Sequence, residues 1–159
     1  MKKVELMTPL KNYKSLNAVL NETDAVYFGI ESFNMRMFSD NFRLNDLNKI
    51  VKDCHDYNVK AYLTTNIIMY ENEFKLLDQI LDKAIESEID AVIIHDIGAI
   101  QIVKEKGLPY HISTQANISN SRAALFYESL GASRLILARE LSLEQIKDIK
   151  QKSNRNSNP

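Results

Sequence analysis

The sequence contains few of the residues that build disulfides, metal centres and phosphate-binding turns. Its 159 residues include one cysteine, Cys54, together with four glycines and three prolines. A single thiol excludes an internal disulfide, a CxxC pair and an all-cysteine metal site on this chain alone. The first apolar run continues into Met7-Thr-Pro-Leu-Lys11, without a glycine-rich phosphate turn. A Rossmann-type nucleotide site is therefore disfavoured.

The sequence also has little net charge and no long apolar stretch. Its 20 Lys and Arg residues are balanced by 21 Asp and Glu residues, which gives a formal charge of -1. This balance provides no global field that would attract nucleic acid or an anionic membrane. The longest apolar runs, at 91–94 and 135–138, are much shorter than the roughly 20 residues that span a bilayer. We expect a soluble, cytoplasmic protein without a membrane segment.

What the sequence does contain is an alternation of short apolar runs with longer segments of helical period. Most runs are rich in β-branched or aromatic residues and are apolar at consecutive positions, as in strands of a parallel sheet that are covered on both faces. One intervening segment carries Leu47, Ile50, Val51 and Cys54 at helical spacing. The pattern predicts six strand-helix units. The predicted strands are residues 4–7, 25–28, 59–63, 91–94, 111–113 and 134–137.

Local signals mark where several helices begin and end. Ser119 or Asn120 is suited to begin the fifth helix, and Ser142 stands three residues before Gln145, the spacing of a capping box. Gly131 follows the predicted fifth helix at the position where a left-handed residue commonly ends one.

Polar residues stand at the carboxyl ends of nearly all the predicted strands. A β/α barrel gathers such ends on one face, whereas a doubly wound sheet uses mainly those at its switch point. We therefore predict an α/β fold, an incomplete parallel (β/α) barrel of TIM type, with a flavodoxin-like or Rossmann sheet as the alternative. The polar strand ends are Thr64-Thr-Asn66, His95-Asp96, Ser113-Thr-Gln115 and Arg139-Glu140.

The predicted barrel is too short to close. A closed barrel has eight strands and about 250 residues, whereas this chain offers about six units over residues 1–150, followed by a polar tail at 151–159 that we expect to be disordered. An open arc exposes two strand edges. We expect a truncated product or a chain that needs a partner.

Four segments of the sequence resemble the amino-terminal region of the U32 peptidase family. The resemblance extends over about residues 4–149, and its last two segments are highly specific in order and spacing. At the end of the first strand the chain has Thr8-Pro-Leu-Lys11 where the family usually has Ala-Pro-Ala-Gly. The four segments are Ala25-Val-Tyr-Phe-Gly29 with Phe33-Asn-Met-Arg36, Ala61-Tyr-Leu-Thr-Thr-Asn66, His111-Ile-Ser-Thr-Gln-Ala-Asn117 with Ser119-Asn120, and Leu137-Ala-Arg-Glu-Leu-Ser-Leu143.

The resemblance implies two kinds of activity. The family was named for collagenase-like peptidases, but other members perform oxygen-independent hydroxylation of transfer RNA, ribosomal RNA or a quinone precursor. Those hydroxylases use an iron-sulfur cluster held by cysteines that follow the region present here, and prephenate is implicated for several of them. The resemblance thus implies an RNA or peptide substrate. It also suggests, as partner, a second U32-like chain or the missing carboxyl-terminal half; we expect no cofactor on this chain alone.

The candidate binding residues lie at or just beyond the strand ends. Arg36 is suited to clamp a carboxylate or phosphate through two hydrogen bonds, or to form an ion pair within its loop. The amides of Asn66, Gln115 and Asn117 are suited to orient a substrate or a flipped base, or to satisfy backbone groups of their loops.

Four further candidates form two adjacent pairs. His95 offers an imidazole near neutral pH beside Asp96, and Arg139 stands beside Glu140. Neighbouring strand residues point to opposite faces, so neither pair is a simple facing dyad. For Arg139 and Glu140 we favour a structural salt bridge at the barrel rim, in which either residue pairs with one from a neighbouring strand.

No hydrolytic motif supports a peptidase. The sequence has no HExxH and no GxSxG, and Cys54 belongs to an apolar helical stripe. Whether this chain is itself an enzyme, and whether a peptidase, a hydroxylase or a non-catalytic fragment, stays open at this point.

Overall fold

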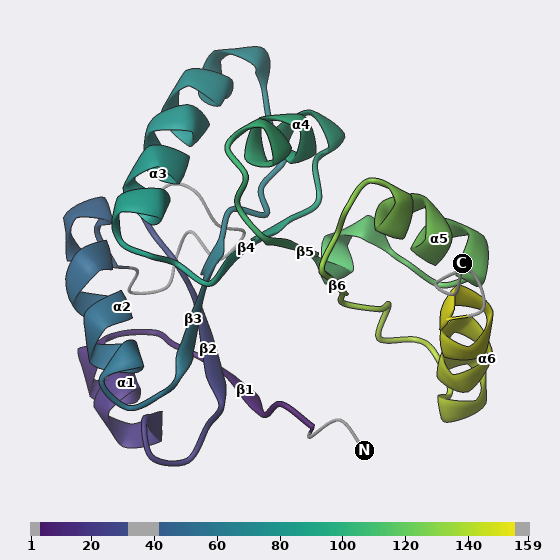
Figure 1. The fold of residues 1–159 in the computed structure, drawn as a ribbon, viewed down its shortest axis with the longest axis horizontal. Helices are drawn as coiled ribbons and strands as arrows, with labels where there is room; N and C mark the ends of the chain where they lie inside the picture. Colours follow the sequence, from purple (N-terminus) through teal and green to yellow (C-terminus); the bar gives the residue numbers. More distant parts are fainter. Residues whose placement is uncertain (1–3, 32–41, 155–159) are drawn as a thin grey trace.

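The structure, a computed structural model, describes residues 4–31 and 42–154, and its centre is a sheet of six parallel strands. The strands follow one another in sequence order and form an arc that is open between the first and the last (Figure 1). This is a half-barrel with alternating helices, so the predicted fold class is confirmed. The strands are β1 (Met7–Pro9), β2 (Ala25–Gly29), β3 (Lys60–Thr64), β4 (Ala91–Ile94), β5 (Tyr110–Ile112) and β6 (Arg134–Leu135).

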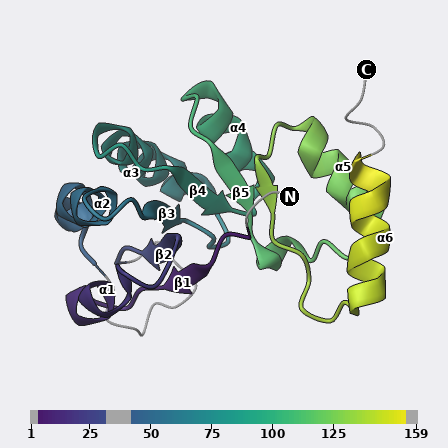
Figure 2. The same ribbon diagram turned by 60° about the horizontal axis from the view of Figure 1, so that its bottom comes forward.

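The helices lie on the convex side of the arc. The first four cover β1 to β5, whereas α5 and α6 pack together beyond β6 (Figures 1 and 2). The helices are α1 (Tyr13–Val19), α2 (Leu47–His55), α3 (Phe74–Glu86), α4 (Ile97–Glu105), α5 (Ser121–Ser129) and α6 (Leu143–Asn154), and the short 3-10 turns are η1 (Leu44–Asp46), η2 (Glu71–Glu73) and η3 (Thr114–Ala116).

Alternation along the strands divides the buried residues into two clusters. Val26, Phe28 and Leu63 point outward and join the large core beneath the helices. Tyr62 and Ile93 belong to a smaller cluster on the concave side. In a parallel arc, residues of one face form layers, and Tyr62 is registered with Ala91 on the next strand while Ile93 is registered with His111. The concave side is thus partly filled by side chains.

The predicted helix ends are confirmed. Asn120 begins α5 by accepting the Ala123 N–H at 3.0 Å. Ser142 and Gln145 form the capping box, with Ser142 N–H to Gln145 Oε1 at 2.8 Å and Gln145 N–H to Ser142 Oγ at 3.2 Å. Gly131 has a φ of +101°, which favours glycine. Helix α6 continues to Asn154, through four residues of the predicted tail, and residues 155–159 lie outside the described ones.

The first strand lies further along the chain than predicted. The apolar run at 4–7 suggested a strand there, but β1 is Met7–Pro9, and Val4 and Leu6 are 87% and 57% exposed. Pro9 is tolerated because β1 is an edge strand, where a missing N–H breaks no ladder. Apolar composition alone misplaced this strand, because an edge strand needs less burial than an inner one.

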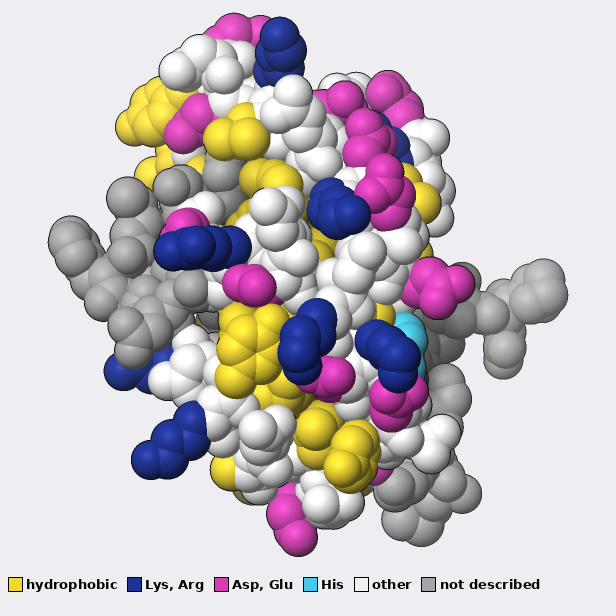
Figure 3. All heavy atoms as spheres, turned by 90° about the vertical axis from the view of Figure 1, so that its left-hand side faces the viewer, with side chains coloured by type: hydrophobic (Ala, Val, Ile, Leu, Met, Phe, Trp, Pro, Cys, Tyr) yellow, Lys and Arg dark blue, Asp and Glu magenta, His cyan; other side chains and the backbone are white. Residues whose placement is uncertain are grey.

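The outer face of the helices carries charges of both signs. Lys49 and Asp53 form an ion pair at 2.5 Å on α2, and Lys83 pairs with Glu86 at 2.9 Å on α3. Figure 3, which shows the side of the molecule at the left of Figure 1, has basic and acidic side chains interspersed rather than gathered by sign. Within the described residues, no helix has the length and hydrophobicity needed to cross a membrane.

Candidate functional site

A pocket of about 730 Å³ opens at the carboxyl ends of the strands. Its walls come from both ends of the arc, because segments following β1 and β6 line it together with the ends of β2, β3 and β5. We call it the carboxyl-end pocket. Its lining includes Met7, Pro9, Leu10, Lys11, Tyr27, Gly29, Thr64, Asn66, Ile93, Ser113, Thr114, Gln115, Ile136, Leu137 and Arg139.

Hydrogen bonds fix several polar side chains of this pocket. Asn66 donates from Nδ2 to the Ser113 hydroxyl at 3.1 Å and thereby joins the ends of β3 and β5. Thr64 donates its hydroxyl to the Phe28 carbonyl of the neighbouring strand at 2.8 Å. Ser113 also accepts the Gln115 N–H at 3.3 Å, which holds the start of η3. The Gln115 side chain is exposed at the carboxyl-end pocket.

The charge of the carboxyl-end pocket has one sign among its described lining residues. Lys11 and Arg139 line the pocket from opposite ends of the arc, and the lining includes no Asp or Glu. Both side chains are exposed, and neither forms an ion pair with another described residue. Two cations with nearby hydroxyl and amide groups suit a carboxylate or a phosphate.

The structure brings three of the predicted site residues together and separates the others. Asn66, Gln115 and Arg139 line the carboxyl-end pocket. Asn117 and Glu140 line a second hollow of about 520 Å³ next to the start of α6. Arg139 and Glu140 line different hollows, and neither forms the expected salt bridge with a neighbouring strand in the described part of the chain. Arg36 lies outside the described residues.

His95 and Asp96 have separate environments. Asp96 begins α4 by accepting the Ala99 N–H at 3.0 Å. His95 is half-buried, and burial outweighs the charge of Asp96 and lowers the pKa of the imidazole below its usual 6.5. Its Nδ1 has no hydrogen-bond partner among the described residues. Asp96 thus serves as a helix cap, and neither residue lines the carboxyl-end pocket.

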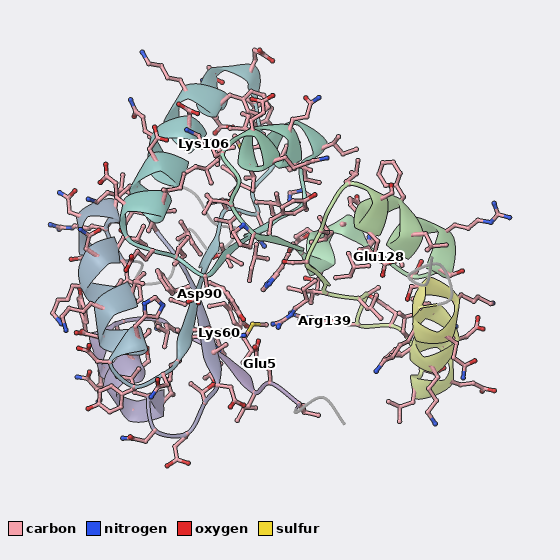
Figure 4. All side chains as sticks on the ribbon, in the orientation of Figure 1. Glu5, Lys60, Asp90, Lys106, Glu128 and Arg139 are labelled. Atoms are coloured by element: carbon pink, nitrogen blue, oxygen red, sulfur yellow. The ribbon has the colours of Figure 1, made fainter. Side chains whose placement is uncertain are left out.

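Sequence reasoning missed a group of polar residues in the concave interior towards the amino ends of the strands. Glu5 accepts hydrogen bonds from Arg134 at 2.5 Å, from the Tyr62 hydroxyl at 3.0 Å and from Lys60 at 3.1 Å. Arg134 also lies over the Tyr62 ring, 5.4 Å from its centroid. Figure 4 shows Glu5 and Lys60 close together within the arc. We call Glu5, Lys60, Tyr62, Arg134 and the neighbouring His111 the interior cluster.

Burial and pairing shift the pKa values within the interior cluster. Burial alone would raise the pKa of Glu5, but hydrogen bonds from Arg134, Lys60 and Tyr62 outweigh it and lower the pKa to about 2. Burial, together with the Glu5 hydrogen bond, raises the pKa of Tyr62 to about 12. Glu5 is therefore ionised and Tyr62 is neutral at physiological pH.

His111, on β5, is the most buried of the three histidines. It is 5% exposed, its ring meets that of Tyr62 edge to face at 4.6 Å, and its Nδ1 lacks a hydrogen-bond partner among the described residues. Burial, aided by the charge of Arg134, lowers the pKa of His111 to about 4. Along β3, Lys60 and Tyr62 alternate with the apolar Ala61 and Leu63, and this alternation was the one local sequence signal for a polar interior face.

The residues present do not fit an iron-sulfur cluster on this chain. Such clusters are held by several cysteine thiolates, and the chain has one cysteine, Cys54, which is fully buried in α2. Burial raises the pKa of its thiol to about 12. Residues 4–31 and 42–154 contain no group of three His, Cys, Asp or Glu side chains placed to bind a metal. His55, next to Cys54, instead contacts Asp90 at 2.9 Å.

Two solved structures are similar to this chain in fold. The chain is similar in fold to the U32 peptidase Mk0906, with a TM-score of 0.76 and 16% identity over 96% of this chain and 67% of that one. It also resembles a thiamine phosphate pyrophosphorylase from Pyrococcus furiosus, with a TM-score of 0.61 and 14% identity over 92% and 69% of the two chains. At these identities the likeness concerns the fold alone.

Curated sequences are more closely related. The chain is 44% identical to the uncharacterized protease MJ0090 of Methanocaldococcus jannaschii, over 93% of this chain and 36% of the relative. It is 42% identical to a collagenase of Porphyromonas gingivalis, over 91% and 35%. It is 33% identical to tRNA hydroxylation protein P of Escherichia coli, over 94% and 34%. The chain thus spans about a third of the length of these relatives.

The family model agrees with the fold and the relatives. The model of peptidase family U32 matches residues 11–157, which include every residue of the carboxyl-end pocket from Lys11 onward. The chain belongs to peptidase family U32.

Proposed function

We propose that this chain is the substrate-binding half-barrel of a U32 enzyme of the RNA-hydroxylating type, and that its carboxyl-end pocket binds a small anionic organic substrate. The observation that carries the proposal is the one-signed charge of the pocket: Lys11 and Arg139 line it without an acidic neighbour in its described lining. Apolar side chains such as Ile93 and Ile136 offer a surface for the carbon skeleton of such a ligand. Prephenate, which the resemblance implies, has this chemistry.

The RNA part of the proposal rests on the relatives. Hydrolysis of a peptide bond needs an activated nucleophile or a metal. An RNA-modifying enzyme of this type instead needs a pocket for its small-molecule substrate and a surface that binds RNA. One relative, 31% identical over 94% of this chain, is the 23S rRNA 5-hydroxycytidine C2501 synthase of Escherichia coli. An RNA substrate implies a cytoplasmic site of action.

Ligand binding tests the pocket directly. Calorimetric titration of the chain with citrate, inorganic phosphate and prephenate should show binding by at least one anion. Replacing both cations, in Lys11→Gln with Arg139→Gln, should weaken that binding at least tenfold, because each charge-assisted hydrogen bond contributes about 1.5–3 kcal/mol. Lys14→Gln, an exposed lysine of α1 outside the pocket lining, is the control and should bind as the unaltered chain does. Equal binding by all three proteins would refute the anion site.

The proposed hydroxylation activity is tested in a hybrid that joins this chain to the carboxyl-terminal part of a relative. The chain, joined to the cysteine-containing remainder of tRNA hydroxylation protein P, is expressed in bacteria that lack their own tRNA hydroxylation proteins, and hydroxylated nucleosides are measured by mass spectrometry. We expect the nucleoside with the hybrid and none with the chain alone. A folded, iron-loaded hybrid that produces no modified nucleoside would contradict the proposal.

A collagenase-like peptidase is the second candidate, favoured by the 42% identity to the Porphyromonas gingivalis collagenase. Digestion of gelatin by the purified chain is the test. Alanine substitutions at Asn66, Gln115 and Arg139 should then abolish the digestion; digestion that survives them would indicate a contaminating protease.

A non-catalytic pairing subunit is the third candidate. It is favoured by the unpaired outer edges of β1 and β6 in the described sheet and by the exposure of Val4 and Leu6 beside β1. Co-expression with a second U32-like chain or with a carboxyl-terminal half should yield a stable complex in size-exclusion chromatography. A stable monomer that captures neither would remove this candidate.

A further inference from the structure

The carboxyl-end pocket depends on two strands that are not paired with each other. Lys11 follows β1 and Arg139 follows β6, and these strands stand at opposite ends of the sheet. In a closed barrel, backbone hydrogen bonds would fix the separation of all neighbouring strands. In the open arc, the described sheet contains no ladder between β1 and β6. The distance between the two cations is therefore set through the four strands between them and by any side chains that join β1 and β6 directly.

Glu5 joins the two ends of the arc. It stands two residues before β1, and it contacts Arg134, the first residue of β6, at 2.5 Å across 129 positions of sequence. Its other carboxylate oxygen accepts from Lys60, the first residue of β3. One carboxylate thus connects the beginnings of β1, β3 and β6 from inside the arc.

Burial makes this connection stronger than a surface ion pair. The Glu5 side chain is 19% exposed and that of Arg134 is 35% exposed, whereas the two carriers of the Lys49–Asp53 pair on α2 are 64% and 28% exposed. Tyr62, which donates to Glu5 and lies under the Arg134 guanidinium, is 2% exposed. Exposed pairs contribute little because water and salt screen them, but a pair held against a buried ring is screened less.

We propose that Glu5 is a positioning residue, which, through Arg134 and Lys60, sets the separation of β1 and β6 and thereby the spacing of Lys11 and Arg139 across the carboxyl-end pocket. Glu5 itself does not line that pocket. The ligand chemistry rests on the proposed function, whereas the positioning can be measured without a ligand.

Distance measurement provides the test that needs no ligand. Spin labels are attached at Lys14→Cys on α1 and Glu144→Cys on α6, both exposed and both outside the pocket, while the buried Cys54 stays unlabelled. The distance distribution between the labels should be narrow in the otherwise unaltered chain and broader or shifted in Glu5→Gln. Lys52→Gln, which breaks the exposed Lys52–Asp56 pair of the same length on α2, is the matched control and should leave the distribution unchanged.

Anion binding provides the second readout. Glu5→Gln should weaken the binding of citrate or phosphate about fivefold or more, a typical coupling between separate sites, and Lys52→Gln should not. Glu5→Asp, which keeps the carboxylate on a shorter side chain, should retain more of the affinity and of the narrow distribution than Glu5→Gln. If Glu5→Gln fails to fold by circular dichroism, Arg134→Lys, which keeps the charge on a shorter side chain, is measured in its place.

The outcomes separate the two proposals. If no anion binds but the label distance responds to Glu5, the proposed ligand chemistry is wrong and the positioning role stands. If anions bind and neither the label distance nor the affinity responds to Glu5→Gln, the positioning role is overturned and the pocket stands.

Discussion

The two ends of the half-barrel interior use charge in different ways. Towards the amino ends of the strands, Glu5 contacts Arg134, Tyr62 and Lys60; the first three of these residues are partly or fully buried, and Lys60 is exposed. At the carboxyl ends, Lys11 and Arg139 are exposed and form no ion pair with another described residue. Paired charges in the interior hold strands, whereas unpaired charges at a pocket are available to a ligand. Substitutions at the amino end should therefore change stability, and those at the carboxyl end should change binding.

The largest effect is expected for Tyr62→Ala. This removes a ring that is 2% exposed, contacts His111 and Arg134, and donates to Glu5. The cavity and the lost hydrogen bond should lower the free energy of unfolding by about 3 to 5 kcal/mol, measured by urea denaturation. Tyr70→Ala, at a tyrosine that is 65% exposed, is the control and should cost less than about 1 kcal/mol. Similar losses for both tyrosines would contradict the structural role of the interior cluster.

His111 should make the protein sensitive to moderate acid. Its pKa is about 4 when folded and 6.5 in the unfolded chain, so the unfolded state binds the proton first. The contribution of neutral His111 to the free energy of unfolding is complete above pH 6.5. It is lost as the pH falls towards 4, by about 3 kcal/mol in total. The charged and titratable groups around the ring are Tyr62 of β3, Arg134 of β6, Glu5 and Lys60.

The measurement compares urea denaturation of the chain and of His111→Leu between pH 7.5 and 4.5. Leucine cannot take up a proton and leaves no unpartnered Nδ1, so the variant should lose less stability over this range. The range ends at pH 4.5, the ordinary pKa of a glutamate such as Glu5, so the effect of His111 is measured before that of Glu5 begins. Parallel losses in both proteins would show that His111 does not carry the effect.

Glu5 should make the protein sensitive to acid at a lower pH than His111 does. Its pKa is lowered from 4.5 to about 2, so its contribution to stability is complete above pH 4.5 and is lost as the pH falls towards 2. Glu5→Gln should lower the free energy of unfolding at pH 7 by about 2 kcal/mol and flatten its decline below pH 4.5. Thermal unfolding at pH 7.0, 4.5 and 3.0 measures this. A variant as stable as the parent at pH 7 would mean that the ion pair stabilises nothing.

The carboxyl end of the molecule was largely predictable from sequence, and the amino end was not. The strand-helix alternation placed Asn66, Gln115 and Arg139 at strand ends, and a parallel arc necessarily gathers such ends on one side. Asn120 and Ser142 could be identified as caps because capping is a local interaction. The contact of Glu5 with Arg134 spans 129 positions and depends on the curvature of the whole sheet, for which no local pattern exists.

Two of the predicted site residues lie outside the carboxyl-end pocket for the same physical reason. Asp96 and Glu140 follow strands, as Arg139 does, but Asp96 caps α4 and Glu140 faces the second hollow. The direction of a side chain beyond a strand depends on the loop that follows, and the period of two ends with the strand. Lys11 was noticed as a departure from the family pattern, and its place opposite Arg139 in the pocket became visible with the fold.

The smallest effect on stability, and a clear one on binding, is expected for Gln115→Ala. The Gln115 side chain is exposed at the carboxyl-end pocket, and the hydrogen bond that holds its loop comes from its backbone N–H to Ser113. Alanine keeps that N–H, so the free energy of unfolding should change by less than about 0.5 kcal/mol. The affinity for citrate or phosphate should fall roughly fivefold, the equivalent of one hydrogen bond of about 1 kcal/mol. A loss of stability as large as that of Glu5→Gln would break the distinction between the two ends, because a ligand-binding side chain would then also be holding the fold.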